Sequence, residues 1–249
     1  MKKAFFYLAF PFLLMMSGCA ALQQIASTAL EGGTTNTDAL GLKEALRVGV
    51  TNSVSTLGNN GFFTDATLKI LLPPEAQPIV NNLKLIPGGE SLMNDVVQRL
   101  NRAASDAVVE AKPIFINAIT GMTISDATGI LFGANDAATS YLKRTTSAQL
   151  LSAFAPKVNA SLDKKLIGNL STNDSWNALT SAYNTVARSA VGQVANLKPV
   201  ESDLGAYVAQ KALDGLFAKV AAEEKLIRTN PAARVNDLLK NVFGQLDKK

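Results

Sequence analysis

Histidine is absent from this chain of 249 residues, and cysteine occurs only once, at Cys19. Without histidine the chain has no Ser-His-Asp triad, no imidazole metal ligand and no side chain that ordinarily titrates near neutral pH. A single cysteine allows neither an internal disulfide nor a thiolate metal cluster. The side chains left for catalysis are carboxylates, lysines, tyrosines and hydroxyls. The composition therefore favours a non-enzymatic protein, and we assign no catalytic residue, no metal site and no cofactor.

Aromatic and charged residues are also scarce. They make up 6% and 18% of the chain, whereas hydrophobic residues make up 47% and alanine and leucine are frequent. Alanine and leucine favour helices, while strands prefer aromatic and β-branched residues. No run of five or six like charges occurs, so nucleic acid is not an expected partner. We predict an all-α protein with a single multi-helix domain, which leaves room for a small β-hairpin near residues 62–87.

The N-terminus has the three-part layout of a secretory signal. Two lysines precede an apolar run from Ala4 to Met16, and two small residues then stand directly before Cys19. The run is shorter than the roughly 20 residues that cross a bilayer as a helix. We therefore interpret residues 1–18 as a cleaved signal peptide.

Met16-Ser17-Gly18-Cys19 resembles the lipobox of bacterial lipoproteins, in which cleavage takes place before a cysteine that carries a diacylglyceryl group. Cys19 is then the predicted lipidation site and the mature N-terminus, and its two or three acyl chains are enough for stable membrane attachment. Ala20 follows, and the enterobacterial sorting rule for a residue other than Asp predicts the outer membrane, facing the periplasm. The alternatives are an ordinary secreted protein, or a cytosolic protein with a buried apolar N-terminal helix.

The mature chain divides into a short anchor segment and a helical body. Residues 19–37 are predicted to form the lipid anchor and a flexible tether, because Gly32–Thr37 is uncharged and rich in glycine and threonine. Residues 38–249 are predicted to form one helical domain, with Asp38 as the cap of its first helix.

Apolar residues at spacings of three and four predict the helices of this body. The first stripe consists of Leu42, Leu46, Val50, Val54 and Leu57, and Gly58-Asn59-Asn60-Gly61 ends it. The clearest helix covers residues 90–111 until Pro113 kinks or ends it, and Ser125 is the predicted cap of the next turn, 126–132. Further helices are predicted at 135–143, 145–167 with an interruption at Pro156, 173–191, 202–229 and 231–243.

Motifs spread over nearly the whole mature chain point to one family. They are Gly41-Leu42-Lys43-Glu44-Ala45-Leu46, Asn101-Arg102-Ala103-Ala104, Met122-Thr123-Ile124-Ser125-Asp126-Ala127, Ala137-Ala138-Thr139-Ser140-Tyr141, Gly215-Leu216-Phe217, Ile227-Arg228-Thr229-Asn230-Pro231 and Leu238-Leu239-Lys240-Asn241-Val242-Phe243-Gly244. In this order they resemble a bacterial family catalogued as domain of unknown function number 4197. The resemblance implies an exported, often lipidated, helical protein, and it brings no activity, cofactor or catalytic residue. Ser105 stands where the family pattern has glutamate.

Five charged residues form a candidate functional polar cluster: Arg102, Asp106, Asp126, Glu224 and Arg228. Two pairs among them are spaced four residues apart, which is equally the spacing of ordinary ion pairs on a helix. Asp126 lies among small and apolar residues. Three interpretations are open: it stabilises the first turn of a helix, it pairs in the core with an arginine, or it is a functional acid. Trp176 and Tyr183, seven residues apart, are interpreted as core residues.

Three functions remain open from the sequence. The first is a non-enzymatic lipoprotein, held on the membrane through Cys19, whose helical domain binds another envelope protein or the cell wall. The second is a carrier or sensor of a small apolar ligand between helices, which a cavity lined by residues 114–132 and 213–220 would favour. The third is a carboxylate-dependent cell-wall hydrolase, which needs two acids facing one cleft, with Glu110, Asp126 and Glu224 as candidates.

Overall fold

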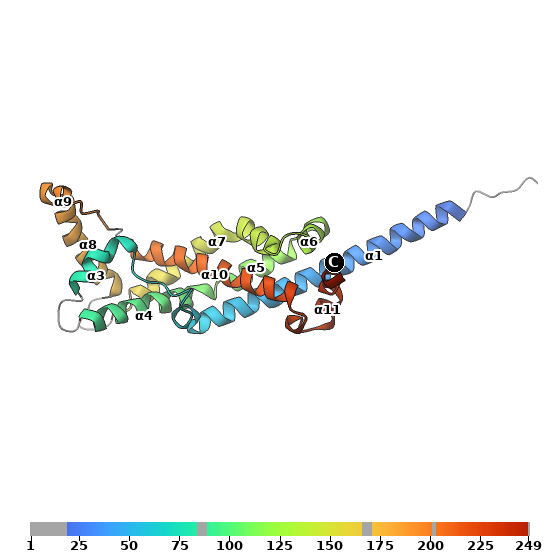
Figure 1. The fold of residues 1–249 in the computed structure, drawn as a ribbon, viewed down its shortest axis with the longest axis horizontal. Helices are drawn as coiled ribbons and strands as arrows, with labels where there is room; N and C mark the ends of the chain where they lie inside the picture. Colours follow the sequence, from blue (N-terminus) through green and yellow to red (C-terminus); the bar gives the residue numbers. More distant parts are fainter. Residues whose placement is uncertain (1–18, 84–88, 166–170, 201–202, 249) are drawn as a thin grey trace, which may run out of the picture.

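The structure, a computed structural model, describes residues 19–83, 89–165, 171–200 and 203–248. Over these ranges it is helical, without a strand, and forms one elongated bundle (Figure 1). The α-helices are α1 (Cys19–Thr56), α2 (Phe62–Thr64), α3 (Gln77–Leu83), α4 (Gly89–Val108), α5 (Ala111–Thr120), α6 (Ile124–Leu131), α7 (Ala137–Leu162), α8 (Thr172–Ala187), α9 (Ala190–Val194), α10 (Leu204–Thr229) and α11 (Asp237–Phe243). The predicted all-α, single-domain fold is confirmed.

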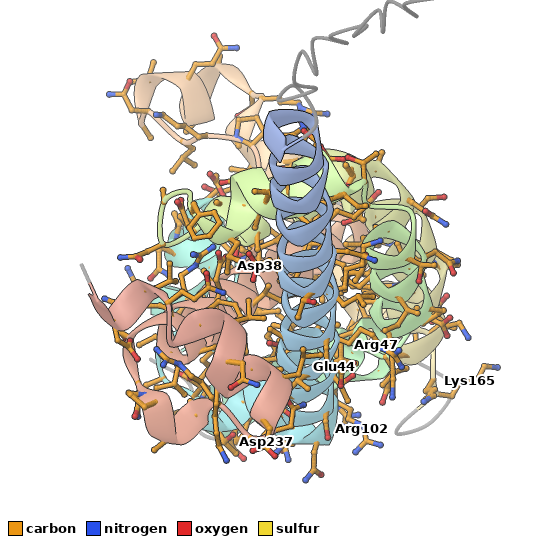
Figure 2. The ribbon with its side chains drawn as sticks, turned by 90° about the vertical axis from the view of Figure 1, so that its right-hand side faces the viewer. Asp38, Glu44, Arg47, Arg102, Lys165 and Asp237 are labelled. Atoms are coloured by element: carbon orange, nitrogen blue, oxygen red, sulfur yellow. The ribbon has the colours of Figure 1, made fainter. Side chains whose placement is uncertain are left out.

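Three long helices, α4, α7 and α10, pack on one another and form the body of the bundle. The C-terminal part of α1 packs against this body, while its N-terminal part projects beyond it at one end (Figure 1). Viewed from that end, α1 runs in front of the body, with α11 on one side and α5 on the other (Figure 2). The helices α8 and α9 lie at the opposite end of the molecule (Figure 1).

The predicted apolar stripe of α1 is the face that packs into the core. All five of its residues are buried, and α1 packs against α5, α6, α10 and α11, which also contribute buried apolar residues to the core. Phe115 of α5 and Phe217 of α10 pack edge to face, with ring centroids 5.9 Å apart. The body is thus held together mainly by apolar burial, which is the usual source of helix stability in a folded protein.

The predicted irregular tether at Gly32–Thr37 is instead helical. Helix α1 is continuous from Cys19 to Thr56, and these residues lie within it. Asp38 is accordingly not a helix cap. It is buried in mid-helix, where its carboxylate accepts a hydrogen bond of 2.8 Å from Gln245 near the C-terminus. Intrinsic propensity, which disfavours a Gly-Gly-Thr-Thr helix, is a weak predictor when neighbouring turns are helical.

The end of α1 lies where the sequence predicts it. Leu57–Gly61 forms a π-helical turn in which Asn60 adopts φ 64°, a left-handed conformation that asparagine tolerates. Ser105 of α4 is buried beside this turn and donates a 2.7 Å hydrogen bond to the Leu57 carbonyl. The residue at which this chain departs from the expected family pattern therefore ties α4 to the backbone at the distorted end of α1.

The hairpin allowed near residues 62–87 is not present in the described part of that segment. After α2 the chain passes through a turn into an extended connection and then into α3. Asn101 of α4 holds this connection at Ile70, accepting from its N–H and donating to its carbonyl at 2.8 Å each. A side-chain amide thus replaces the partner strand, and it satisfies the buried backbone of Ile70.

Several predicted helix boundaries are wrong. The helix predicted at 90–111 ends at Val108, and Pro113 lies in the first turn of α5, where its missing N–H costs little. The two helices predicted between 135 and 167 are one helix that continues through Pro156. The helix at 202–229 is confirmed as α10, to within two residues.

Candidate functional site

Arg102 and Asp106 form an ion pair on the surface of α4. The Arg102 Nε lies 2.9 Å from Asp106 Oδ1, and the Arg102 side chain is 71% exposed. Figure 2 marks Arg102 on the ribbon. Asp106 also accepts a 2.8 Å hydrogen bond from Ser161 at the C-terminal end of α7. Burial raises the pKa of Asp106, but the hydrogen bonds from Ser161 and Arg102 outweigh it and hold the pKa below its ordinary value. The pair therefore has the geometry of a surface contact between α4 and α7.

Asp126 stabilises the first turn of α6, as one of its three interpretations predicted. Its carboxylate accepts hydrogen bonds from the Thr123 N–H at 3.2 Å and Thr123 Oγ1 at 2.7 Å, and its own N–H donates to Thr123 Oγ1. This is a capping box, and these bonds from Thr123 hold the pKa of Asp126 below its ordinary value. The helix cap is Thr123 and not the predicted Ser125.

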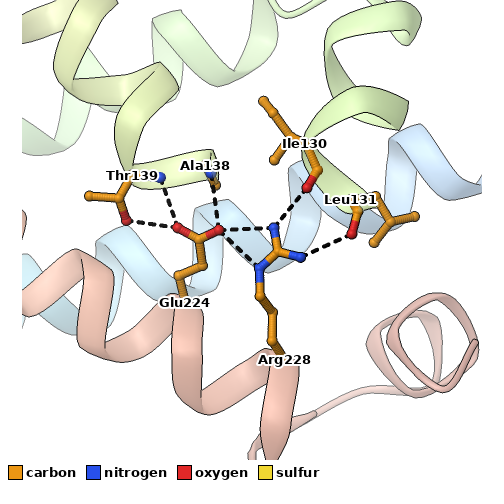
Figure 3. Close-up of polar contacts among 6 residues, drawn as sticks. All are labelled: Ile130, Leu131, Ala138, Thr139, Glu224 and Arg228. Atoms are coloured by element: carbon orange, nitrogen blue, oxygen red, sulfur yellow. Dashed lines mark hydrogen bonds and ion pairs between the residues drawn. The ribbon is translucent and has the colours of Figure 1, made fainter. Parts of the chain in front are cut away.

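Glu224 lies on α10 with its carboxylate buried against the first turn of α7 (Figure 3). Oε1 accepts from the Ala138 N–H at 3.0 Å, and Oε2 accepts from the Thr139 N–H at 2.8 Å and from Thr139 Oγ1 at 2.7 Å. The first N–H groups of a helix have no partner within it. The N-cap residue of α7, Asp136, makes no side-chain capping bond, so Glu224 caps α7 from another helix.

Arg228, one turn further along α10, is bound to the last turn of α6 (Figure 3). Its Nη2 and Nη1 donate to the carbonyls of Ile130 and Leu131 at 2.8 and 2.9 Å, and its Nε donates to Glu224 Oε1 at 3.0 Å. We call Glu224 and Arg228 the α10 clasp. Its negative member meets a helix N-terminus and its positive member a C-terminus, so both charges complement the helix dipoles.

The five predicted residues therefore lie in three places. Asp106 contacts α7 at Ser161, while Glu224 contacts it at Thr139, and 22 residues of helix at 1.5 Å each separate these points by about 33 Å. Asp126 is exposed at the start of α6, whereas Arg228 binds its end. The structure brings together only Glu224 with Arg228 and Arg102 with Asp106.

The carboxylates named for hydrolysis do not share a cleft. Glu110 pairs with Lys157 at 2.8 Å, and Lys157 lies 18 residues, or about 27 Å of helix, from the part of α7 that Glu224 caps. Both oxygens of Glu224 are engaged by donors of the fold. The geometry gives the hydrolase hypothesis none of the acid pairs that it needs.

A second buried arginine, which the sequence interpretation missed, closes the end of α10. Arg234 donates to the carbonyls of Ile227 and Arg228 at 3.1 Å and makes two bonds to Asp247, at 2.5 and 2.8 Å. These bonds hold the pKa of Asp247 below its ordinary value. No local spacing connects residues 234 and 247, so no sequence signal could have identified this pair.

A small cavity adjoins the α10 clasp. Its volume is about 20 Å³, and its walls come from α1, α7, α10 and α11, including Leu46, Val220 and Phe243. This volume accommodates about one water molecule. For a carrier, the sequence predicted a cavity lined by residues 114–132 and 213–220. Of these residues, only Val220 lines the observed cavity.

Two open grooves run beside the extended connection after α2. The larger, of about 490 Å³, lies between residues 67–77 and α10 at Tyr207, Lys211 and Asp214. The Tyr207 hydroxyl donates to the Leu71 carbonyl at 3.1 Å across one end of it. Both signs of charge line this groove, so it shows no preference for a charged ligand.

The two most exposed large apolar side chains of the described structure lie together at one end of it. We call residues 184–200 the apolar tip: the last turn of α8, the whole of α9 and the connection to Val200. Val191 and Val194 are 75% and 86% exposed, and Val186 is 53% exposed. Val191 and Val194 are three residues apart on α9 and therefore share a face. The sequence predicted one helix at 173–191, whereas the structure has α8 ending at Ala187 and a separate α9, so the tip was not predicted.

Among the residues that the structure describes, no group of three metal-ligating side chains comes together. Within the same ranges, no single helix is both long and apolar enough to cross a membrane. One sharply bent pair, Met93–Thr120 followed by Ile124–Leu131 at 106°, meets the length and composition criteria jointly. Its residues Phe115 and Ile119 are buried in the core, as expected for a core helix that passes such a test.

These features define a single all-α domain whose buried charges tie its helices together. The chain belongs to the family described as protein of unknown function (DUF4197), whose model matches residues 33–244. The family that the motifs predicted is thus confirmed. No curated protein and no solved structure matches the chain.

Proposed function

We propose that this protein is a lipid-anchored envelope protein, held on the outer membrane through Cys19 and facing the periplasm, whose helical body binds another component of the envelope without enzymatic chemistry. The observation that carries the anchor is the order of the N-terminal features: two lysines, an apolar run, two small residues and then the only cysteine. The family match begins after them, at residue 33.

The use of charged residues in the body supports a binding role. The α10 clasp and the pair Arg234–Asp247 direct their polar atoms at the protein's own backbone, at the Thr139 hydroxyl or at each other. Reactive sites usually keep a strongly perturbed group aimed into a cleft. The apolar tip, by contrast, directs its side chains outward, and exposed apolar surface commonly marks an interaction site.

The anchor is tested by Cys19→Ser. We expect the unmodified protein to sediment with membranes and to yield an N-terminal peptide whose mass includes a diacylglyceryl group and an amide-linked acyl chain. The Cys19→Ser protein should lack this mass and, where cleavage still occurs, appear in the soluble periplasmic fraction. Equal membrane retention of the two proteins would contradict the lipid anchor.

The outer-membrane assignment is tested by a matched substitution at the next position. Ala20→Asp leaves Cys19 and its lipid in place but supplies the residue that the enterobacterial sorting rule reads as a retention signal. We expect this variant to move from the outer to the inner membrane fraction on a density gradient. An unchanged distribution would contradict the sorting assignment and leave the lipid anchor standing.

A further inference from the structure

We propose that the apolar tip, residues 184–200, is a membrane-contact element that binds a lipid surface with anionic headgroups. This inference rests on the proposed function in one respect: it names the envelope component that the anchored body contacts.

The exposed valines belong to a well-defined structure. A side chain at Gly192 would place its Cβ only 2.2 Å from the Val186 carbonyl oxygen, so α9 packs backbone to backbone on the end of α8. Asn184 closes the base of the tip by accepting from the Val200 N–H at 2.7 Å and donating to its carbonyl at 3.0 Å. The valines are therefore held outward by the fold and are not exposed by fraying.

The backbone of the tip is hydrogen-bonded within itself. The N–H groups of Gln193, Ala195 and Leu197 donate to carbonyls of the same short segment at 2.9 to 3.0 Å, and the Gly192 N–H donates to Ser189 Oγ. A segment that enters the boundary of a bilayer must satisfy its backbone internally, because hydrocarbon offers no partner. The N–H groups of Gly192, Gln193, Ala195 and Leu197 meet this requirement in the structure.

The charge of the tip favours an anionic surface. Residues 175–200 contain Arg188 and Lys198 and no acidic residue, and both basic side chains are exposed. Long basic side chains beside an inserted apolar patch reach back to the headgroups. A second copy of this chain fits less well as the occupant, because two tips of the same positive charge repel each other.

The position of the tip allows a planar partner to approach. Helix α9 lies at the extreme end of the long axis, on the far side of the body from the start of α1 (Figure 1). A flat surface that approaches this end can meet α9, on which Val191 and Val194 are exposed. Exposed valines elsewhere, such as Val235 beside α11, lack this position.

The test uses the chain from residue 19 with Cys19→Ser, which has every residue that the structure describes and no lipid. Flotation measures its binding to vesicles of phosphatidylcholine alone and of equal parts phosphatidylcholine and phosphatidylglycerol. We expect binding to the mixed vesicles, weakened by salt.

Two sets of variants test which side chains bind. Val191→Asp combined with Val194→Asp should reduce this binding about tenfold or more, and Arg188→Gln combined with Lys198→Gln should remove the preference for phosphatidylglycerol. Val235→Asp is the matched control and should bind as the parent chain does.

A second readout places the tip at the lipid directly. Because Cys19 is the only cysteine, Val194→Cys in this background carries a single thiol for a polarity-sensitive fluorophore. We expect a blue shift of the emission on mixed vesicles from this position and none from Val235→Cys. No binding of the parent chain, or equal binding of the double aspartate variant, would overturn the proposal. Self-association that the aspartates abolish would assign the tip to a contact between copies. Neither result bears on acylation at Cys19, which fractionation tests separately.

Discussion

The α10 clasp and the apolar tip differ in both the polarity and the burial of their side chains. The clasp buries two full charges and satisfies each with several hydrogen bonds, whereas the tip exposes valines on a closed backbone. Burying a charge is costly unless it is paired and hydrogen-bonded. The comparison shows that in this protein charge organises the interior, while the surface most suited to a partner is apolar.

This difference changes what a charged motif means in the sequence. Glu224 and Arg228 have the spacing of a surface ion pair, yet they connect three helices: α10, which carries them, the start of α7 and the end of α6. A substitution there should affect folding, while a substitution at the tip should affect binding.

The largest effect is expected at the clasp. Glu224→Ala removes the cap of α7 and leaves Arg228 buried without its carboxylate, so it should lower the free energy of unfolding by about 3–5 kcal/mol. Urea denaturation followed by far-ultraviolet circular dichroism measures this change. Glu224→Gln, which keeps the shape and one acceptor, should cost less.

The matched control is Arg102→Ala, which removes one member of an exposed ion pair with the same spacing. It should lower the free energy of unfolding by no more than about 0.5 kcal/mol. Similar losses at the two sites would contradict the distinction between a buried clasp and a surface pair.

An intermediate effect is expected at the base of α9. Gly192→Ala forces a Cβ into the Val186 carbonyl and should cost about 1–3 kcal/mol, with faster amide exchange in α9. Gly129→Ala is the matched control, because nothing lies within 4 Å of a Cβ at that position of α6. It should leave stability unchanged or increase it by up to about 1 kcal/mol. Equal protection of α9 in both variants would show that its packing on α8 is loose.

The smallest effect concerns acid. Asp126 has a pKa below its ordinary value because Thr123 donates hydrogen bonds to the carboxylate. Its contribution to stability is present above the unfolded pKa of about 3.9 and is lost as pH falls through the lower folded pKa. Between neutral pH and about pH 2, the free energy of unfolding should therefore depend less steeply on pH in Asp126→Asn than in the parent. Urea unfolding at a series of pH values measures this slope. An identical pH slope would show that the capping box does not persist in solution.

The sequence predicts much of the fold because its signals are local. The stripe on α1, the stop at Asn59-Asn60 and the extent of α10 all follow from spacing and turn chemistry within a few residues. The continuous helix through Gly32–Thr37 and the continuation of α7 through Pro156 do not, because propensity there opposes the observed structure.

The candidate residues illustrate the same limit. The spacing of Glu224 and Arg228 indicates that they pair, but only the fold shows that Thr139 and Leu131, separated from them by more than 80 residues, are their other partners. The tip carried a readable signal, since Ser189 can begin a new helix and valines follow it without an acidic residue. An interpretation guided by charged motifs passed over it.

The continuity of α1 has a geometric consequence for any group attached at residue 19. Each residue of an α-helix turns the chain by about 100° and advances it by about 1.5 Å, so α1 fixes both the stand-off and the azimuth of the bundle relative to its first residue. A flexible chain of that length would fix neither. Removal of one residue between 19 and 37 would rotate the body by more than a quarter turn about the α1 axis, whereas removal of seven would return it almost to its original orientation. The number of residues before the bundle therefore sets its rotation as well as its distance from residue 19.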